Sequence, residues 1–100
     1  MKRNPKEEFI KDRMKSVHIR KIYPLLYWTK CNNCGMEFKR EFMYRCERVG
    51  YMGMYEHVIG CSHCFKDEAD FIEWLKENDF LYTEESLSEK YDNPLWRFKV

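Results

Sequence analysis

Four of the five cysteines in this 100-residue chain form two pairs with two intervening residues, Cys31/Cys34 and Cys61/Cys64. Two cysteines at this spacing can wrap a tight turn so that both sulfur atoms face one ion. Two such pairs supply four thiolates, a closed tetrahedral set that suits Zn²⁺ and leaves no position open for a substrate. Gly35, directly after the first pair, can relieve the backbone beneath the sulfurs. We therefore predict one structural zinc ion held by these four cysteines.

Two other chemistries use the same residues. Cysteine pairs at this spacing form disulfides in redox proteins, but those motifs lie near a strand–helix–strand pattern that this chain lacks. Four thiolates also bind iron, and the Cys-x-x-Cys-Gly segment is similar to that of rubredoxin. The second pair, however, is followed by Phe65 in place of glycine, and the chain is much longer than rubredoxin requires. Zinc is therefore preferred, with iron as the competing metal.

The remaining cysteine and the histidines give no clear sign of catalysis. Cys46 lies in strand register with Phe42 and Tyr44, which predicts a buried thiol. His57 precedes the second cysteine pair, as a histidine does in some HNH nucleases, but residues 65–80 contain no second histidine. The chain also lacks a glycine-rich phosphate loop and a serine nucleophile elbow. We expect no catalytic residue and no small-molecule substrate, and an HNH-like nuclease is only a third alternative.

The segments that flank the first cysteine pair are predicted from local patterns. Asn4 can cap a helix, Pro5 suits its first position, and a stripe of apolar residues at helical spacing follows, so residues 1–22 are predicted as a basic helical segment. Pro24 ends that segment. The apolar run 25–29 predicts a short strand that leads into Cys31.

The segments after the first pair alternate between strand and helix signals. Residues 42–48 and 55–59 have the period-two pattern of strands, and the glycines between them predict a β-hairpin. Residues 67–76 have helical spacing directly after Cys64. The extension 79–100 is predicted to hold a short strand at 80–82, a brief helix capped at Ser86 and a last strand at 95–100.

The order of first cysteine pair, hairpin, second pair and helix resembles the treble-clef zinc finger and is similar to zinc-ribbon domains. The resemblance covers residues 28–76 and implies Cys31, Cys34, Cys61 and Cys64 as ligands, with no catalytic residue. We expect one domain over residues 1–100, an α+β zinc-binding fold with an N-terminal helix and a C-terminal helix and strand extension. Proteins of this group bind nucleic acids or proteins, among other roles, so the resemblance constrains the fold more than the function.

The net charge of +1 conceals two oppositely charged halves. Residues 1–50 carry 13 Lys/Arg and 6 Asp/Glu, whereas residues 51–100 carry 5 and 11. A basic half suits phosphates or an acidic partner, although the two halves can also simply pair with each other. No apolar run is long enough for a membrane span, and the start of the chain lacks the pattern of a secretory signal, so we expect a cytoplasmic protein without a membrane partner.

Two functional hypotheses follow. The first is an interaction module that docks on a protein or nucleoprotein complex such as a polymerase, with candidate contact surfaces at the flexible segment 50–55 and on the acidic C-terminal half. The second is direct binding of DNA or RNA through the basic half. The candidate contact residues are Lys11, Arg13, Lys15, Lys39, Arg40, Arg45, Arg48, Tyr51, Met52 and Tyr55.

Overall fold

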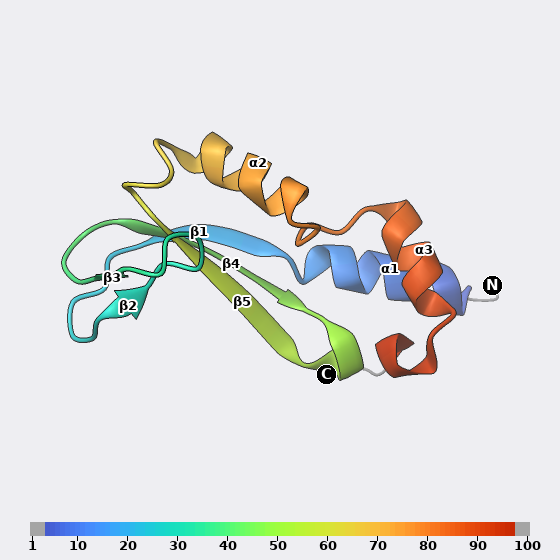
Figure 1. Cartoon of the computed structure of the whole chain (residues 1–100). Coiled ribbons are helices and arrows are strands. Elements are labelled where there is room, and N and C mark those ends of the chain that lie inside the picture. Colours follow the sequence, from blue (N-terminus) through green and yellow to red (C-terminus); the bar gives the residue numbers. More distant parts are fainter. Residues whose placement is uncertain (1–3, 98–100) are drawn as a thin grey trace.

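A long antiparallel hairpin forms the centre of the molecule (Figure 1). Its strands β4 (Met43–Val49) and β5 (Tyr55–Cys61) pair along their whole length, from Met43 opposite Cys61 to Val49 opposite Tyr55. The computed structural model, which describes residues 4–97, thus confirms the hairpin predicted between the two cysteine pairs. The strand β1 (His18–Ile22) pairs with the other edge of β4, which gives a three-stranded sheet of order β1-β4-β5.

The N-terminal helix is shorter than the predicted segment 1–22. The helix α1 (Pro5–Lys15) begins at an Asn4 cap as predicted, but residues 18–22 form β1. Ser16 marks the change, because its hydroxyl donates to the carbonyl of Arg13 and accepts the backbone N–H of Val49. Beyond it, Val17 and Ile19 pack against the sheet core. Packing of these β-branched residues overrides the local helical pattern.

The predicted strand 25–29 is also mostly absent. Only β2 (Thr29–Lys30) forms, and it pairs with β3 (Glu37–Phe38) in a separate two-stranded sheet around the first cysteine pair. Residues 25–28 are an exposed loop, because this segment has no neighbouring strand with which its backbone is paired.

The helix α2 (Glu68–Glu77) covers the sheet at the cysteine end of the hairpin (Figure 1). Its Asp67 cap accepts the N–H of Asp70, and Phe71 and Leu75 are fully buried against Tyr44 and Cys46. The predicted helix and the predicted buried thiol are therefore confirmed. Burial raises the pKa of the Cys46 thiol to about 11, so it stays protonated at neutral pH.

The register prediction for one strand residue was wrong. Phe42 was placed on the buried face with Tyr44 and Cys46, but it is half exposed and Met43 is buried instead. The strand begins at Met43, so Phe42 lies in the preceding bend and is not bound by the alternation of the sheet.

The C-terminal segment differs most from its prediction. Residues 80–82 form no strand, and α3 (Glu84–Tyr91) begins at a capping box of Thr83 and Ser86, three residues before the expected cap. Residues 94–97 form the 3₁₀ helix η2 (Pro94–Arg97) in place of the predicted strand, whose last residues, 98–100, lie outside the described part. Trp96 explains the change, because it packs its ring against Tyr51 and Tyr82.

Within residues 4–97, no helix combines the length and the apolarity that crossing a bilayer requires.

Arg13 holds the two termini against the hairpin. Predicted as a partner contact, it is only 5% exposed. Its guanidinium donates to the carbonyls of Val49 and Gly50 at the end of β4 and, at 2.6 Å, to that of Trp96. Burial lowers the pKa of Arg13, but carbonyl acceptors and the ring of Phe9 surround the charge. This residue is structural, and its assignment to a binding surface is corrected.

We predict that Arg13→Ala lowers the free energy of unfolding by about 2–4 kcal/mol, because hydrogen bonds from a charged donor are lost and buried carbonyls are left unpaired. Lys11→Ala, on an exposed position of the same helix, should change it by less than about 0.5 kcal/mol. Urea denaturation followed by far-UV circular dichroism measures both. Equal stabilities of the two variants would contradict the structural role.

Candidate metal centre

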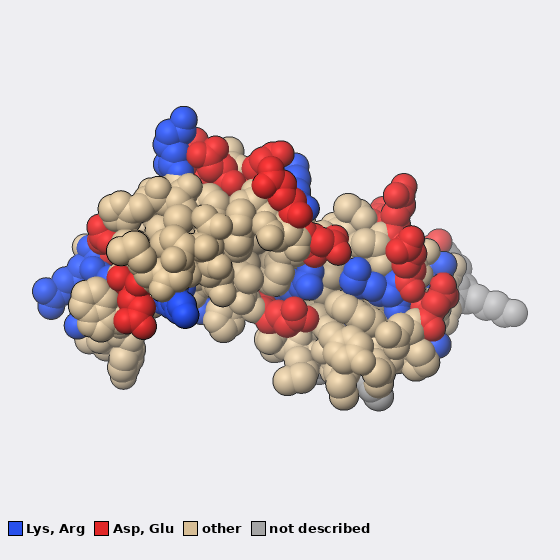
Figure 2. Space-filling view, viewed as in Figure 1, with Lys and Arg blue, Asp and Glu red and all other residues tan. Residues whose placement is uncertain are grey.

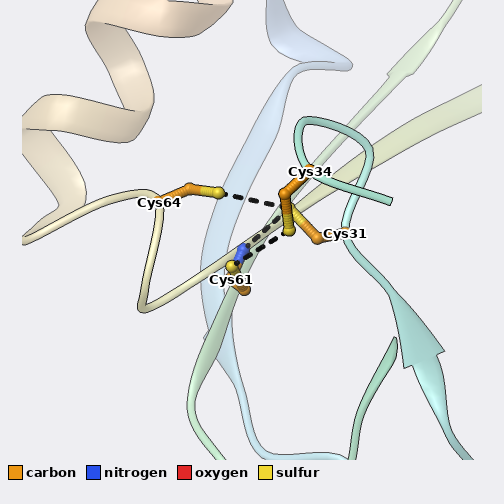
Figure 3. Close-up of side chains that lie close together, drawn as sticks. All are labelled: Cys31, Cys34, Cys61 and Cys64. Atoms are coloured by element: carbon orange, nitrogen blue, oxygen red, sulfur yellow. Dashed lines mark hydrogen bonds between the residues drawn. The ribbon is translucent and has the colours of Figure 1, made fainter. Parts of the chain in front are cut away.

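The four predicted cysteines converge at one point (Figure 3), where all their sulfur atoms lie within 4.8 Å of one another. The Sγ atoms of Cys31 and Cys64 are 3.9 Å apart, as are those of Cys34 and Cys61. Zn–S bonds of about 2.3 Å place the sulfurs of a tetrahedral site about 3.8 Å apart. Each close contact joins one cysteine of the first pair to one of the second, so a metal here would connect both.

All five cysteines are free thiols, so the disulfide alternative has no counterpart in the structure. Four soft sulfur donors favour zinc or iron over oxygen-seeking ions such as Mg²⁺. Among residues 4–97, this is the one group of three or more histidine, cysteine or carboxylate side chains close enough to hold a metal. The structure thus supports a metal-binding Cys₄ site compatible with zinc.

The backbone gives the two pairs the same turn. Gly35 N–H donates to the Cys31 carbonyl at 2.9 Å, and Phe65 N–H donates to the Cys61 carbonyl at 3.1 Å. Gly35 has a φ of 76°, so the glycine is needed for the left-handed conformation, as predicted. Phe65 closes its turn without a positive φ, which explains how the second pair forms without a glycine.

Backbone N–H groups also act on the sulfurs themselves. Burial alone raises the pKa of Cys31, but N–H groups of Cys34, Cys61 and Asn33 outweigh it and lower the pKa to about 7. Burial raises the pKa of Cys61 to about 12. A bound divalent cation would supply the positive charge that allows four thiolates to share this space. The helix α2 begins at Glu68, four residues after Cys64 and one residue later than predicted.

Asn32 is a site residue that the sequence analysis did not identify. Its backbone N–H donates to the Ile59 carbonyl, and its side-chain Oδ1 accepts the Ile59 N–H, both at 2.7 Å. These two hydrogen bonds connect the first cysteine pair to β5, two residues before Cys61. The signal was present only as an Asn between two cysteines, and nothing local indicated the distant strand as its partner.

Gly60 is the second missed residue. A Cβ atom built there would lie 2.4 Å from the ring of Phe65 and 2.9 Å from that of Phe71. The absence of a side chain therefore lets the core under α2 pack directly beside Cys61.

The other predicted contact residues lie at opposite ends of the molecule. Lys11 and Lys15 are exposed on α1, and Tyr51, Met52 and Tyr55 are exposed at the far end of the hairpin. Lys39 and Arg40 lie beyond β3 at the cysteine end. The structure does not bring them into one surface.

Two of the predicted arginines have partners within the chain. Arg45 forms an ion pair with Glu47 at 3.4 Å. Arg48 donates to the carbonyl of Phe80 at 2.5 Å and lies over the rings of Phe80 and Tyr82, 4.2 and 4.6 Å from their centroids. Arg48 thus fixes the segment between α2 and α3 to the sheet, a contact within the chain that its place among the candidate contact residues did not indicate.

The histidines do not extend the cysteine site. His57 is exposed on β5, in register with Glu47. His63, between the two cysteines of the second pair, stacks on Phe38 and lies 3.2 Å from a carboxylate oxygen of Glu41. His57 is therefore exposed to solvent, and His63 makes contacts with neighbouring side chains of the chain.

Comparison of the chain with protein-family models, with curated protein sequences and with solved structures finds no match in any of the three.

We predict that the purified protein binds one zinc ion per chain, and that a strong chelator or Cys61→Ser removes it and unfolds residues 28–76. Structural zinc contributes about 10–16 kcal/mol in finger peptides, which is more than a core of this size can replace. Metal analysis and near-UV circular dichroism provide the measurement. An unchanged spectrum after verified metal removal would contradict the prediction.

Thiol counting offers a control for that experiment. A thiol-specific reagent should reach Cys46, which is fully buried in the folded chain, only after the chelator is added, together with the four ligand cysteines, because Cys46 lies within the segment 28–76 that is expected to unfold. Cys46→Ala should keep the zinc ion, in contrast to Cys61→Ser.

We also predict that Asn32→Ala weakens metal binding about 10- to 100-fold without removing a ligand, because residues that orient metal ligands contribute on this scale. Competition with a chromophoric zinc chelator measures the affinity. The neighbouring Asn33→Ala, at an exposed position between the same cysteines, should have little effect. Equal affinities of the two variants would show that the bonds to Ile59 do not support the site.

Proposed function

We propose that this chain is a non-catalytic structural-zinc module that acts by docking on a protein or nucleoprotein complex. The observation that carries the proposal is a Cys₄ cluster that offers four ligands and no open position, in a structure that leaves apolar side chains exposed in a fixed arrangement. A closed set of thiolates stabilises a fold and does not activate a substrate. The order of first cysteine pair, hairpin, second pair and helix supports placing it with treble-clef zinc fingers.

The docking surface that we propose is the hairpin tip, residues 51–55. It contains the 3₁₀ helix η1 (Tyr51–Gly53), followed by Met54 and Tyr55, which are 65% and 70% exposed. Figure 2 shows an uncharged area over this end of the molecule, at the lower right. Tyrosine and methionine are enriched at protein interfaces, since they offer large contact areas and adaptable packing.

The tip cannot easily fold back to cover these side chains. Gly50 N–H donates to the Met54 carbonyl at 2.8 Å, and Tyr51 N–H donates to Glu56 Oε1 at 3.1 Å. The ring of Tyr51 is further held against Trp96. A preorganised apolar surface of this kind loses little conformational entropy when a partner covers it.

A pull-down of the zinc-loaded protein, compared between nuclease-treated and untreated extracts, tests the proposal. We expect a protein partner that is still recovered after nuclease treatment. The double variant Met54→Ser/Tyr55→Ser should lower the amount of partner recovered at least tenfold. Tyr27→Ser, an equally exposed tyrosine at the opposite end, is the matched control and should keep the partner. Retention by the tip variant, or equal loss with both variants at unchanged thermal stability, would contradict docking through the tip.

A further inference from the structure

A second exposed apolar surface lies at the cysteine end, about as far from the hairpin tip as the molecule allows (Figure 1). We call it the aromatic end and define it by its rings and its cations, which are Tyr23, Tyr27, Trp28, Phe42, Lys21, Lys39 and Arg40. Tyr27 and Trp28 are 79% and 63% exposed, and the adjacent Leu25 and Leu26 are exposed as well. Contiguous apolar side chains on a surface mark an interaction site.

The loop of residues 23–28, which carries Tyr27 and Trp28, is attached to the rest of the chain at both of its ends. Arg40 N–H donates to the Pro24 carbonyl at 2.7 Å, and the rings of Tyr23 and Phe42 are in contact, with centroids 4.8 Å apart. On the other side of the loop, Thr29 pairs with Phe38. Both ends of the loop are therefore held, and Tyr27 and Trp28 are exposed between them. A shallow groove of about 420 Å³ runs between the loop and the sheet.

Positive charge is interleaved with the rings. Lys21 Nζ lies 4.4 Å from the centroid of Phe42, and Lys39 Nζ lies 6.0 Å from that of Trp28. Residues 18–45 carry six Lys/Arg and two Glu, and Figure 2 shows both blue and red side chains beside uncharged ones at this end. The acidic residues of α2 lie along the upper side of the same view.

We propose that the aromatic end binds single-stranded nucleic acid. Unpaired bases stack on aromatic rings while cations neutralise the phosphates, and a single strand alternates these groups within a few ångströms, as the surface does. An anionic bilayer separates its charged headgroups and its apolar core into layers. That arrangement fits less well with lysines that lie 4.4 and 6.0 Å from the ring centroids. A duplex stacks its bases on one another, so it offers phosphates and base edges but no free base faces on which the rings can stack. This inference goes beyond the proposed function, because it uses the opposite end of the molecule.

The test is fluorescence anisotropy of labelled 20-nucleotide dT and rU strands with the full zinc-loaded chain between 50 and 200 mM NaCl. Each phosphate contact on a single strand contributes about −0.7 to the slope of log K against log salt, so three cations predict a slope of about −2. Trp28→Ala should weaken binding about 10- to 100-fold, since one stacked base contributes on this scale. Lys21→Gln/Lys39→Gln should make the slope shallower by about 1.4.

Matched controls separate this surface from the rest of the chain. Tyr55→Ala at the hairpin tip and Lys66→Gln, both at exposed positions, should leave binding within about twofold. Near-UV circular dichroism and retained zinc verify that each variant is folded. Because Tyr55 belongs to the proposed docking surface, the two proposals can fail independently.

A second readout remains informative if a variant is unstable. Stacking on the exposed Trp28 should quench tryptophan emission when dT is added, and Trp28→Phe should bind but lose this quenching. Three outcomes would overturn the inference: no binding of either strand at 50 mM NaCl, equal affinity for a duplex, or binding unaffected by Trp28→Ala. If the protein binds neither strand but sediments together with phosphatidylglycerol vesicles, the aromatic end is a membrane-binding surface instead.

Discussion

The meeting of two cysteine pairs that are 26 residues apart in the chain is the constraint on which the structure depends. The intervening residues must leave the first pair, run out along β4, return along β5 and arrive within 4.8 Å of the start. The hairpin satisfies this requirement because Met43 and Cys61 are paired at its open end. A metal ion at this point would close the loop, and it would also fix the small sheet of β2 and β3 against the main one.

The rest of the fold consists of small apolar clusters along an axis of about 50 Å. One surrounds the cysteines, one lies beneath α2, and one joins α1 to α3. Because each cluster is small, hydrogen bonds from polar side chains also hold the segments together, a role that apolar packing alone could fill in a larger core. Arg13 ties the terminal helices to the end of β4, and Arg48 ties the segment after α2 to the same strand. Both arginines therefore make contacts inside the molecule that connect segments distant in the chain.

An elongated scaffold of this kind separates its two exposed apolar surfaces. The hairpin tip presents methionine and tyrosine with the carboxylate of Glu56 beside Tyr51, whereas the aromatic end combines rings with lysines. Different chemistry at the two ends is compatible with simultaneous contacts to two partners, such as the protein and nucleic-acid parts of one complex. The cations of the aromatic end all come from the basic half of the sequence, whereas the acidic residues of the second half include those on α2 and α3.

Features that depend on local patterns could be predicted from the sequence. The spacing of the cysteines predicted their convergence, the alternation of residues 42–48 and 55–59 predicted the hairpin, and the apolar spacing after Asp67 predicted α2. Errors arose where a partner distant in the chain decided the outcome. Residues 18–22 form a strand because the edge of β4 can pair with them. Residues 95–97 belong to a 3₁₀ helix because this conformation lets Trp96 pack against the ring of Tyr51. Local sequence does not contain that information.

The sequence by itself determined the ligand type, the order of the elements around the ligands and the charge of each half, since these follow from residue identity and short-range spacing. The tertiary structure alone decided which polar and aromatic residues face outward. Arg13 and Arg48 look like surface cations in the sequence but are bound by carbonyls from other segments. Tyr27 and Trp28 belong to an apolar run that was predicted as a short strand, but they lie in an exposed loop whose two ends are held by Arg40 and Phe42 on one side and by Phe38 on the other. Exposure is set by contacts between distant segments, and only the folded chain brings those segments together.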